Sequence, residues 1–296
     1  MVGENRRTFW SVFGKVPFIL LALTMLVPYY WMAVGSLKPV PELLRTPPTF
    51  TVENPTLNSF YDPQGNSPPN HVEGLFQRFT NVPWRFGTFY VNSVVITVIN
   101  TVVSLVIASA AAYVFAKLRI PGRNVIFLIV VASMMVPWQV TIIPNFLTMR
   151  DFGWINSYTA LIVPTLAKAF AVFFLRQYMS TLPDDLLDAA RIDGAGEVRI
   201  WWSIVLPLVG PALTAMAIFV LLGEWNNFLW PLIVVQDDAH ATLPLILARM
   251  SNTLLNPATT GVVMAASLLT SIPTVLFFLF FQKQFVEGIA LTGVKG

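Results

Sequence analysis

The sequence predicts an all-α integral membrane protein with about six transmembrane helices. Of its 296 residues, 55% are hydrophobic and only 11% are charged. Because soluble domains carry about a quarter charged residues, a chain this apolar needs lipid as part of its solvent. Phenylalanine (23) and tryptophan (9) are abundant, as expected where aromatic rings lie at the two headgroup levels of a bilayer.

The composition also excludes several classes of function. The chain has no cysteine, so it cannot form a disulfide, a thiolate metal site or a thiol nucleophile. Its two histidines, His71 and His240, stand in polar connecting segments, so we expect no histidine-based metal cluster. The net charge is only +3, and most basic residues stand just outside apolar runs. Basic residues in these positions set the orientation of membrane spans. We therefore do not interpret them as a nucleic-acid-binding surface.

Six apolar segments are the predicted spans, most of them near the roughly 20 residues that a bilayer needs. The fifth is the shortest, because Gly223–Asn227 interrupts an apolar run that resumes at Phe228–Val235. About eight residues cannot cross a bilayer alone, so we expect Phe228–Val235 to be a re-entrant or kinked continuation. The predicted spans are Val16–Gly35, Tyr90–Phe115, Asn124–Leu147, Tyr158–Phe174, Leu208–Leu222 and Gly261–Phe281.

Six spans place both termini on one side of the membrane, and the basic residues select that side. Eleven lysines and arginines lie before the first span, after the last span or in the second and fourth connections, against six in the other connections. Because basic residues are enriched on the cytoplasmic side, we predict a cytoplasmic N-terminus (1–15), a transmembrane domain (16–282) and a cytoplasmic C-terminal tail (283–296) in the cell membrane.

The N-terminal Arg6-Arg7-Thr8-Phe9 is similar to a twin-arginine export signal. However, the apolar run that follows is longer than the hydrophobic region of a signal peptide, no convincing A-x-A cleavage site comes after it, and five more predicted spans follow. We therefore predict an uncleaved first span.

The first connection, residues 38–87, is long and polar, with turn residues most dense at Pro63–Asn70. We predict an extracytoplasmic loop with a short helix near Val72–Phe79. Two interpretations of this loop stay open. It either contacts a soluble partner or forms surface without a binding role.

The fourth connection, residues 177–207, is predicted to be a cytoplasmic helix–turn–helix. Thr181 is a suitable N-cap, Pro183 is tolerated in the first turn, and the acidic residues that follow favour the positive end of the helix dipole. Asp193–Gly196 breaks this helix, and a second helix runs from Glu197. The segment is too polar to enter the bilayer and too regular to be a linker.

A spaced motif runs through this connection. It reads Asp188-Ala189-Ala190-Arg191-Ile192-Asp193-Gly194-Ala195 and, further on, Ile204-Val205-Leu206-Pro207. This motif resembles the EAA loop of importer permeases of the ATP-binding-cassette (ABC) class, with an aspartate where the family usually has glutamate. In that family the loop is the coupling helix, which seats in a groove of the ATPase subunit. The resemblance implies ATPase coupling for Asp188, Ala189, Ala190, Asp193, Gly194, Ala195, Leu206 and Pro207.

The sequence itself agrees that any ATPase is a separate chain. No G-x-x-x-x-G-K-[ST] motif or other glycine-rich phosphate loop after a strand is present. We therefore expect no cofactor on this chain, no catalysis of covalent chemistry by it, and ATP with Mg on partner ATPase subunits. The alternative for the fourth connection is an amphipathic interfacial helix pair without a partner.

The resemblance extends over most of Ser36–Gly296. The segments 225–232, 242–245 and 281–296 are similar to the carbohydrate-uptake branch, particularly its maltose-type second permease. This similarity implies a type I ABC importer permease fold in the cell inner membrane. It also implies a second homologous permease subunit, two ABC ATPase subunits, an extracytoplasmic sugar-binding protein and a sugar substrate. The 38–87 loop is longer than expected for that branch, so no contact role is carried over to it.

Candidate residues for a substrate path lie within or beside the spans. A charged residue inside or at the end of a span costs free energy, so it is predicted to have a functional role. Lys168 and Glu224 are such residues. They are expected to pair or to line a polar cavity, unless Lys168 snorkels to the interface and Glu224 is simply interfacial. A sugar also needs hydrogen-bonding groups and an aromatic face. Two clusters offer both, Trp225-Asn226-Asn227 and Trp138-Gln139, although helix packing and interface anchoring are equally good explanations.

Two rival classes of function remain. A self-contained secondary transporter usually has ion-coupling carboxylates at mid-membrane and paired inverted repeats, and the sequence shows neither clearly. A membrane-embedded enzyme needs a catalytic constellation, for which no cysteine and only loop histidines are available.

Overall fold

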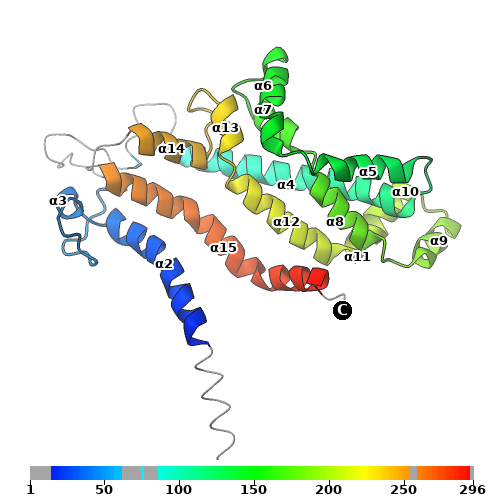
Figure 1. Cartoon of the computed structure of the whole chain (residues 1–296), viewed down its shortest axis with the longest axis horizontal. Helices are drawn as coiled ribbons and strands as arrows, with labels where there is room; N and C mark the ends of the chain where they lie inside the picture. Colours follow the sequence, from blue (N-terminus) through cyan, green and yellow to red (C-terminus); the bar gives the residue numbers. More distant parts are fainter. Residues whose placement is uncertain (1–14, 62–74, 77–85, 254–258, 294–296) are drawn as a thin grey trace, which may run out of the picture. The chain divides into compact units, whose positions relative to one another are not determined.

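The computed structural model describes residues 15–61, 75–76, 86–253 and 259–293. Every regular element in these ranges is a helix (Figure 1), which confirms the predicted all-α class. The chain divides into two compact units. Unit 1 comprises residues 1–86 and 247–272, and unit 2 comprises residues 87–246 and 273–296. The Arg6-Arg7 pair, most of the predicted helix near Val72–Phe79 and residues 294–296 lie outside the described residues.

Among the described residues, three helices are long and apolar enough to cross a membrane, and the number rises to six if each of three bent helix pairs is one span. The six candidates overlap the six predicted spans. The long helices are α2 (Val16–Ser36), α4 (Phe86–Lys117) and α15 (Thr260–Gly293, of which Thr260–Gln282 is the candidate span). The bent pairs are Arg123–Ser133 with Trp138–Asp151, Tyr158–Thr165 with Ala169–Met179, and Glu197–Leu208 with Gly210–Trp225.

The third predicted span is not one straight helix. Helix α5 (Arg123–Ser133) ends before Pro137, and a 3-10 turn, η1 (Trp138–Thr141), leads into α6 (Ile142–Asp151), with a bend of 90° across the break. Proline has no N–H to donate and restricts the residue before it, so the helix cannot continue through this position. The predicted range Asn124–Leu147 therefore contains a sharp corner.

The end of the fifth span also differs from the prediction. We expected an interruption over Gly223–Asn227, but α12 (Gly210–Trp225) continues through Gly223 and Glu224. In an apolar environment a helix that breaks leaves backbone groups unpaired, so this helix tolerates one glycine and ends only at Asn226. The expected continuation is a short separate helix, α13 (Leu229–Val234).

In unit 1, α2 and the first part of α15 approach each other closely at two glycines. A Cβ on Gly35 would lie only 2.1 Å from Sδ of Met264, and one on Gly261 would lie 2.6 Å from Oγ of Ser59. Small residues at such crossings let the backbones of membrane helices pack together. The remainder of α2 exposes its apolar side chains, as expected of a span that faces lipid or a partner subunit.

The first part of the predicted extracytoplasmic loop folds around Glu42 in α3 (Val40–Leu43). The buried Glu42 carboxylate accepts hydrogen bonds from the backbone N–H groups of Glu53 (3.0 Å) and Asn54 (3.3 Å). The bond from Glu53 is the main cause that lowers the pKa of Glu42. These bonds give residues 42–54 a defined shape.

The core of unit 2 lies where the long α4 meets α12, α8 (Ala169–Met179) and the fourth connection. Helix α8 packs against both α5 and α12 (Figure 1). Because side chains from the connection join this core, the connection is part of the folded unit. The largest fully buried side chains of this cluster are Leu175, Met179, Leu187, Ile200, Val205 and Val209.

Candidate functional site

The fourth connection forms the predicted helix–turn–helix. Helix α9 (Asp184–Ile192) and helix α10 (Glu197–Ile200) flank a short turn. A π-helical segment, η3 (Trp201–Val205), follows and continues into α11 (Leu206–Leu208). We call the segment from Thr181 to Leu206 the coupling loop, after the role that its resemblance to the EAA loop implies.

The start of α9 is held in a different way from the one predicted. The N-cap residue is Pro183, and the Thr181 hydroxyl donates to the last turn of α8, so Thr181 is not the cap. Instead, Lys117 at the end of α4 donates to the carbonyl oxygen of Leu182 and to the carboxylate of Asp184, both at 2.6 Å. The bond from Lys117 is the main cause that lowers the pKa of Asp184.

The turn between the two helices depends on Gly194, which has a φ of +80°. Its N–H donates to the carbonyl oxygen of Arg191 (3.0 Å), and the N–H of Ala195 donates to that of Ala190 (2.9 Å). These two bonds form a Schellman C-cap, which requires a left-handed residue at this position. A Cβ on Gly194 would meet no atom within 4 Å. Backbone conformation and not space therefore selects glycine here.

Arg191 joins the two helices across this turn. Its Nη1 donates to Asp188 (2.7 Å), its Nε donates to Glu197 (2.8 Å), and Glu197 also accepts a bond from the hydroxyl of Tyr113 in α4. The bond from Arg191 is the largest cause that lowers the pKa of Glu197, followed by the bond from Tyr113. The Asp188 carboxylate is thus ion-paired within the loop while its side chain stays 63% exposed.

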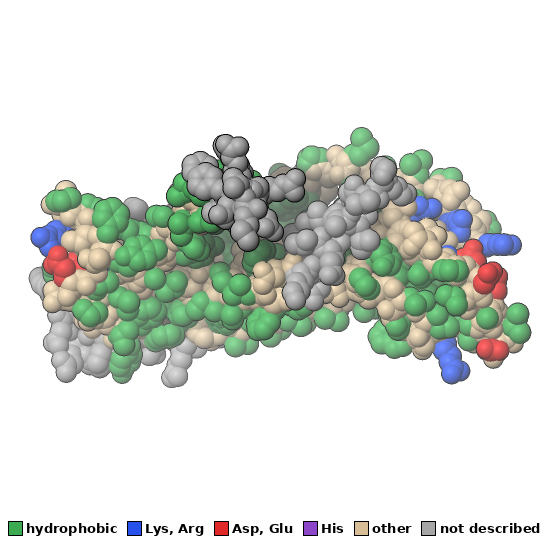
Figure 2. Space-filling view, turned by 90° about the horizontal axis from the view of Figure 1, so that it is seen from below, with side chains coloured by type: hydrophobic (Ala, Val, Ile, Leu, Met, Phe, Trp, Pro, Cys, Tyr) green, Lys and Arg blue, Asp and Glu red, His purple; other side chains and the backbone are tan. Residues whose placement is uncertain are grey.

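Helix α4 therefore holds both halves of the coupling loop. Lys117 fixes the start of α9, and Tyr113, one helical turn earlier, fixes the start of α10 through Glu197. Acidic and basic side chains gather at the end of unit 2 that carries this loop, as Figure 2 shows. These contacts attach the end of α4 to both helices of the coupling loop.

The coupling loop exposes some of its apolar side chains and buries others. Ile192 is 87% exposed, Val198 is 76% exposed and Leu186 is 49% exposed. Exposed apolar surface of this kind often marks a site of protein interaction. Of the residues to which the resemblance assigns coupling, Asp188, Ala189, Asp193, Gly194 and Pro207 are exposed, Ala195 and Leu206 are partly buried, and Ala190 is buried.

A second candidate site is an ion pair between Lys168, within the predicted fourth span, and Glu224, just beyond the predicted end of the fifth. Nζ of Lys168 lies 2.5 Å from Oε1 of Glu224, which confirms the expected pairing. The Glu224 side chain is only 5% exposed and that of Lys168 is 29% exposed. Asn100 of α4 donates to the second carboxylate oxygen at 3.1 Å. Sequence reasoning missed Asn100, although an amide midway along an apolar helix is a signal that could have found it.

More polar side chains are buried along the same helix. The hydroxyls of Thr101 and Ser104, and Oδ1 of Asn100, are buried without a hydrogen-bond partner among the described residues. Buried polar groups normally have partners, so each unpaired group calls for an explanation such as a bound water or a ligand group. Helix α4 therefore offers polar contacts beyond those that this chain satisfies by itself.

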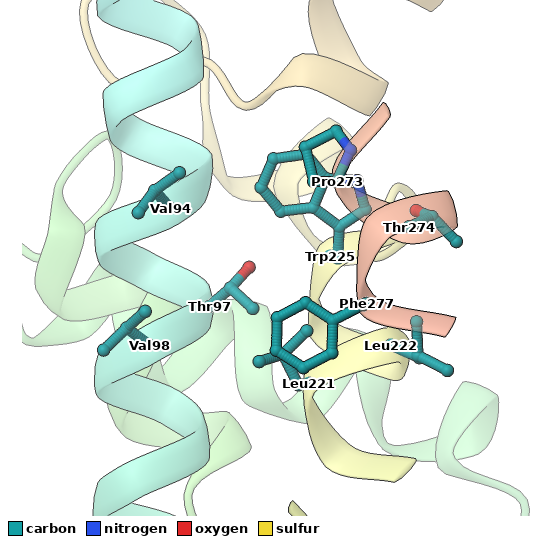
Figure 3. A pocket seen from close by; sticks show the side chains of 9 residues that line it. All are labelled: Val94, Thr97, Val98, Leu221, Leu222, Trp225, Pro273, Thr274 and Phe277. Atoms are coloured by element: carbon teal, nitrogen blue, oxygen red, sulfur yellow. The ribbon is translucent and has the colours of Figure 1, made fainter. Parts of the chain in front are cut away.

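Two cavities in unit 2 share Trp225 and Thr97 in their linings. The larger, of about 110 Å³, lies between α4, α12 and the part of α15 that begins at Pro273 (Figure 3). The smaller, of about 10 Å³, has room for about one water molecule. The larger is lined by Val94, Thr97, Val98, Leu221, Leu222, Trp225, Pro273, Thr274 and Phe277, and the smaller by Ser93, Ile96, Thr97, Leu161, Glu224, Trp225, Asn227, Pro231 and Thr242.

The structure brings together only some of the candidate path residues. Glu224, Trp225 and Asn227 line the same small cavity, and Lys168 reaches it through its ion pair. Asn226 is exposed, and its amide donates to its own helix at the carbonyl oxygen of Leu222 (2.8 Å). Neither Trp138 nor Gln139 lines these two cavities. Both are exposed in η1, beyond the corner at Pro137 that separates them from α5.

Comparison with known proteins identifies the family of the chain. Residues 104–290 match the family described as binding-protein-dependent transport system inner membrane component. The chain is 37% identical over 283 residues to the arabinooligosaccharides transport system permease protein AraQ of Halalkalibacterium halodurans, with 95% of each chain covered. It is 33% identical over 286 residues to the sn-glycerol-3-phosphate transport system permease protein UgpE of Yersinia pestis, with 97% of this chain and 98% of the relative covered.

Two further similarities support the same family. The chain is 30% identical over 289 residues to the lactose transport system permease protein LacG of Rhizobium radiobacter, with 98% of each chain covered. A solved bacterial ABC transporter involved in the import of the acidic polysaccharide alginate has the same fold, with a TM-score of 0.77 at 23% identity over 94% of this chain and 97% of that chain.

The protein is thus an inner-membrane component of a transport system, with several helices long and apolar enough to cross the membrane, and it has the fold of the solved ABC transporter. The chain belongs to the family of binding-protein-dependent transport system inner membrane components. Family membership leaves the self-contained secondary transporter without support.

Proposed function

We propose that this chain is one transmembrane permease subunit of an ATP-driven, binding-protein-dependent sugar importer. The observation that carries the proposal is the coupling loop, which presents exposed apolar side chains such as Ile192 on a frame fixed by Arg191 and Lys117. A rigid apolar surface outside the spans suits docking to another protein. The names of the AraQ and LacG relatives support a sugar as substrate.

In this proposal the chain works with three other subunits and a soluble protein. A second homologous permease forms the other half of the path, two ABC ATPase subunits bind ATP and Mg, and an extracytoplasmic binding protein delivers the sugar. Both termini are cytoplasmic. ATP binding draws the ATPases together and pushes on the coupling loop, which turns the path outward, and hydrolysis resets it.

The substrate path runs past Trp225. This ring and Phe277 offer aromatic surface to the larger cavity, while Glu224, Asn227 and Thr242 offer hydrogen-bonding groups to the smaller one. A sugar ring needs both kinds of contact. In maltose-type systems the other permease holds most of the sugar, so this chain lines the path and contributes a minor share of the affinity.

The first experiment is gentle purification of the chain from its native membrane, followed by mass spectrometry of the proteins that accompany it. We expect a nucleotide-binding subunit and a second six-span permease. Proteoliposomes of this complex, supplied with the extracytoplasmic binding protein, should take up arabinooligosaccharides or lactose only with ATP. Uptake by the chain alone, insensitive to ATP, would refute the proposal. Uptake of sn-glycerol 3-phosphate instead would support the importer assignment but contradict the assignment of a sugar as substrate.

A surface substitution tests the docking role of the coupling loop. Replacing Ile192 with aspartate should weaken recovery of the ATPase subunit with the permease about fivefold, because a charge would enter an apolar contact. Since Ile192 is 87% exposed, the fold of the chain should be unaffected. Ile192→Leu is the matched control and should keep normal recovery. Equal recovery with both variants would contradict a role for Ile192 in docking and would place the ATPase contact elsewhere on the chain.

A further inference from the structure

Lys168 and Glu224 each stand at the unfavourable end of their own helix. Lys168 is the N-cap residue of α8, where the positive end of the helix dipole disfavours a cation, and it makes no side-chain capping bond. Glu224 lies in the last turn of α12, where the negative end disfavours an anion. Local helix stability therefore accounts for neither charge, whereas their mutual contact offsets the cost of both.

Stability of the fold is also a poor explanation for the pair. A charge within a span is expensive, and a buried ion pair is often no more stable than apolar side chains of the same size. Such pairs are nevertheless costly to break, because the remaining charge is left buried. The Glu224 side chain, 5% exposed, is further held by Asn100 of α4. This arrangement is suited to fixing the relative position of helices.

The two helices that the pair joins are the two arms of the coupling loop. Helix α8 enters the loop and α12 leaves it, and both charges lie at the ends remote from the loop. At 1.5 Å per residue, α8 is about 17 Å long and α12 about 24 Å long. Near the loop, Leu175 of α8 and Ala212 of α12 belong to one buried cluster. The arms are thus joined at both ends, and Asn100 attaches them to α4.

The pair also lies directly before the candidate substrate path. Glu224 is adjacent to Trp225, which lines both cavities, and it lines the smaller cavity together with Asn227. A displacement of the coupling loop that travels along α8 or α12 therefore reaches the ion pair beside the residues that line the cavities.

We infer that the Lys168–Glu224 pair, held by Asn100, is a latch that makes α8 and α12 move as one body, so that displacement of the coupling loop reaches the cavities around Trp225. Lys168 and Glu224 are in this respect positioning residues for transport. The inference rests on the proposed function, because it takes the ATPase subunits as the source of the displacement.

The chain has no cysteine, so one introduced thiol gives a reporter without background from this subunit. Phe228 is suitable, because it is 36% exposed and lies three residues after Trp225, just before α13. The reporter variant Phe228→Cys is purified with its partner subunits. Its rate of labelling by a membrane-impermeant maleimide is measured without nucleotide and after trapping with ADP and vanadate. No sugar is added, so a role of Glu224 in sugar binding does not affect this readout.

Three backgrounds are compared, namely the parent, K168M/E224Q and the charge swap K168E/E224K. The double-neutral variant buries no unpaired charge, so its assembly and melting temperature should stay close to those of the parent. Its nucleotide-dependent change in labelling rate should nevertheless fall about fivefold, because the arms are no longer held together. The charge swap should restore much of the response, since rotation of the Asn100 amide presents its unpartnered Oδ1 to the new lysine.

The outcomes separate the latch from the proposed function. A parent complex whose labelling does not respond to nucleotide would contradict the ATP-driven mechanism itself. If the parent responds and the K168M/E224Q variant responds equally, the latch inference is contradicted and the proposed importer function is unaffected. Recovery of the response by the charge swap, with a weak response in the double-neutral variant, would establish that the opposite charges and not the bulk of the side chains do the coupling.

Discussion

Substitution of Gly194 by valine is expected to abolish uptake while the chain remains in the membrane. Gly194 has a φ of +80° and closes the Schellman cap that turns α9 toward α10. A non-glycine residue in this region costs roughly 1–2 kcal/mol, and a β-branched one is disfavoured further. The turn would open, and uptake of labelled sugar by intact cells should fall at least about thirtyfold, which corresponds to roughly 2 kcal/mol. Membrane fractions of the same cells should contain the normal amount of the chain.

Gly196 provides a matched control two residues further along the chain. It has a φ of −72°, which any residue can adopt, and a Cβ there would meet no atom within 4 Å. Gly196→Val should therefore keep most of the uptake. Gly194→Asn should lie between the two, because asparagine tolerates the left-handed region better than valine does. Normal uptake by the Gly194→Val variant would contradict the assignment of this loop to coupling.

The sequence was most informative where a single residue type dictates local geometry. The break at Gly194 depends on a backbone limit that can be recognised without a structure. The cap predicted at Thr181 failed for the opposite reason. Several residues in that turn could cap the start of α9. In the structure Lys117, which is distant in sequence, bonds to this end of the helix.

The candidate site shows the same division. Lys168 and Glu224 stood out because charges are rare within spans, and their pairing followed from opposite sign. Which other residues join them depends on how α4 packs, so Asn100 was missed. Trp138 looked as suitable as Trp225 by residue type, but only Trp225 lines the two cavities. Residue types in the sequence identify candidate polar, charged and aromatic groups. How the helices pack decides which of these groups lie in one site.

Substitution of Arg191 by methionine is expected to reduce the recovery of ATPase subunits with the permease about tenfold. Arg191 is the one side chain in the described part of the loop that bonds to both helices, through Asp188 and Glu197. Hydrogen bonds between charged groups contribute about 1.5–3 kcal/mol each when buried, and a third-exposed side chain retains less of this because of solvent screening, so we expect a loss of roughly 1–2 kcal/mol. Methionine keeps the bulk of the side chain, so packing is largely preserved. The measurement is quantitative co-purification together with ATP-driven uptake in proteoliposomes.

Arg199 is the matched control, since it lies in the same loop, carries the same charge and is exposed. Arg199→Met should have little effect if geometry and not net charge is what matters. Arg191→Lys should rescue poorly, because an ammonium cannot reproduce the fork that reaches both carboxylates. Asp188→Ala removes only one arm of this fork and should have a smaller effect than Arg191→Met. If Asp188→Ala instead abolished recovery while Arg191→Met did not, the Asp188 carboxylate would act on the ATPase directly and its ion pair within the loop would be incidental.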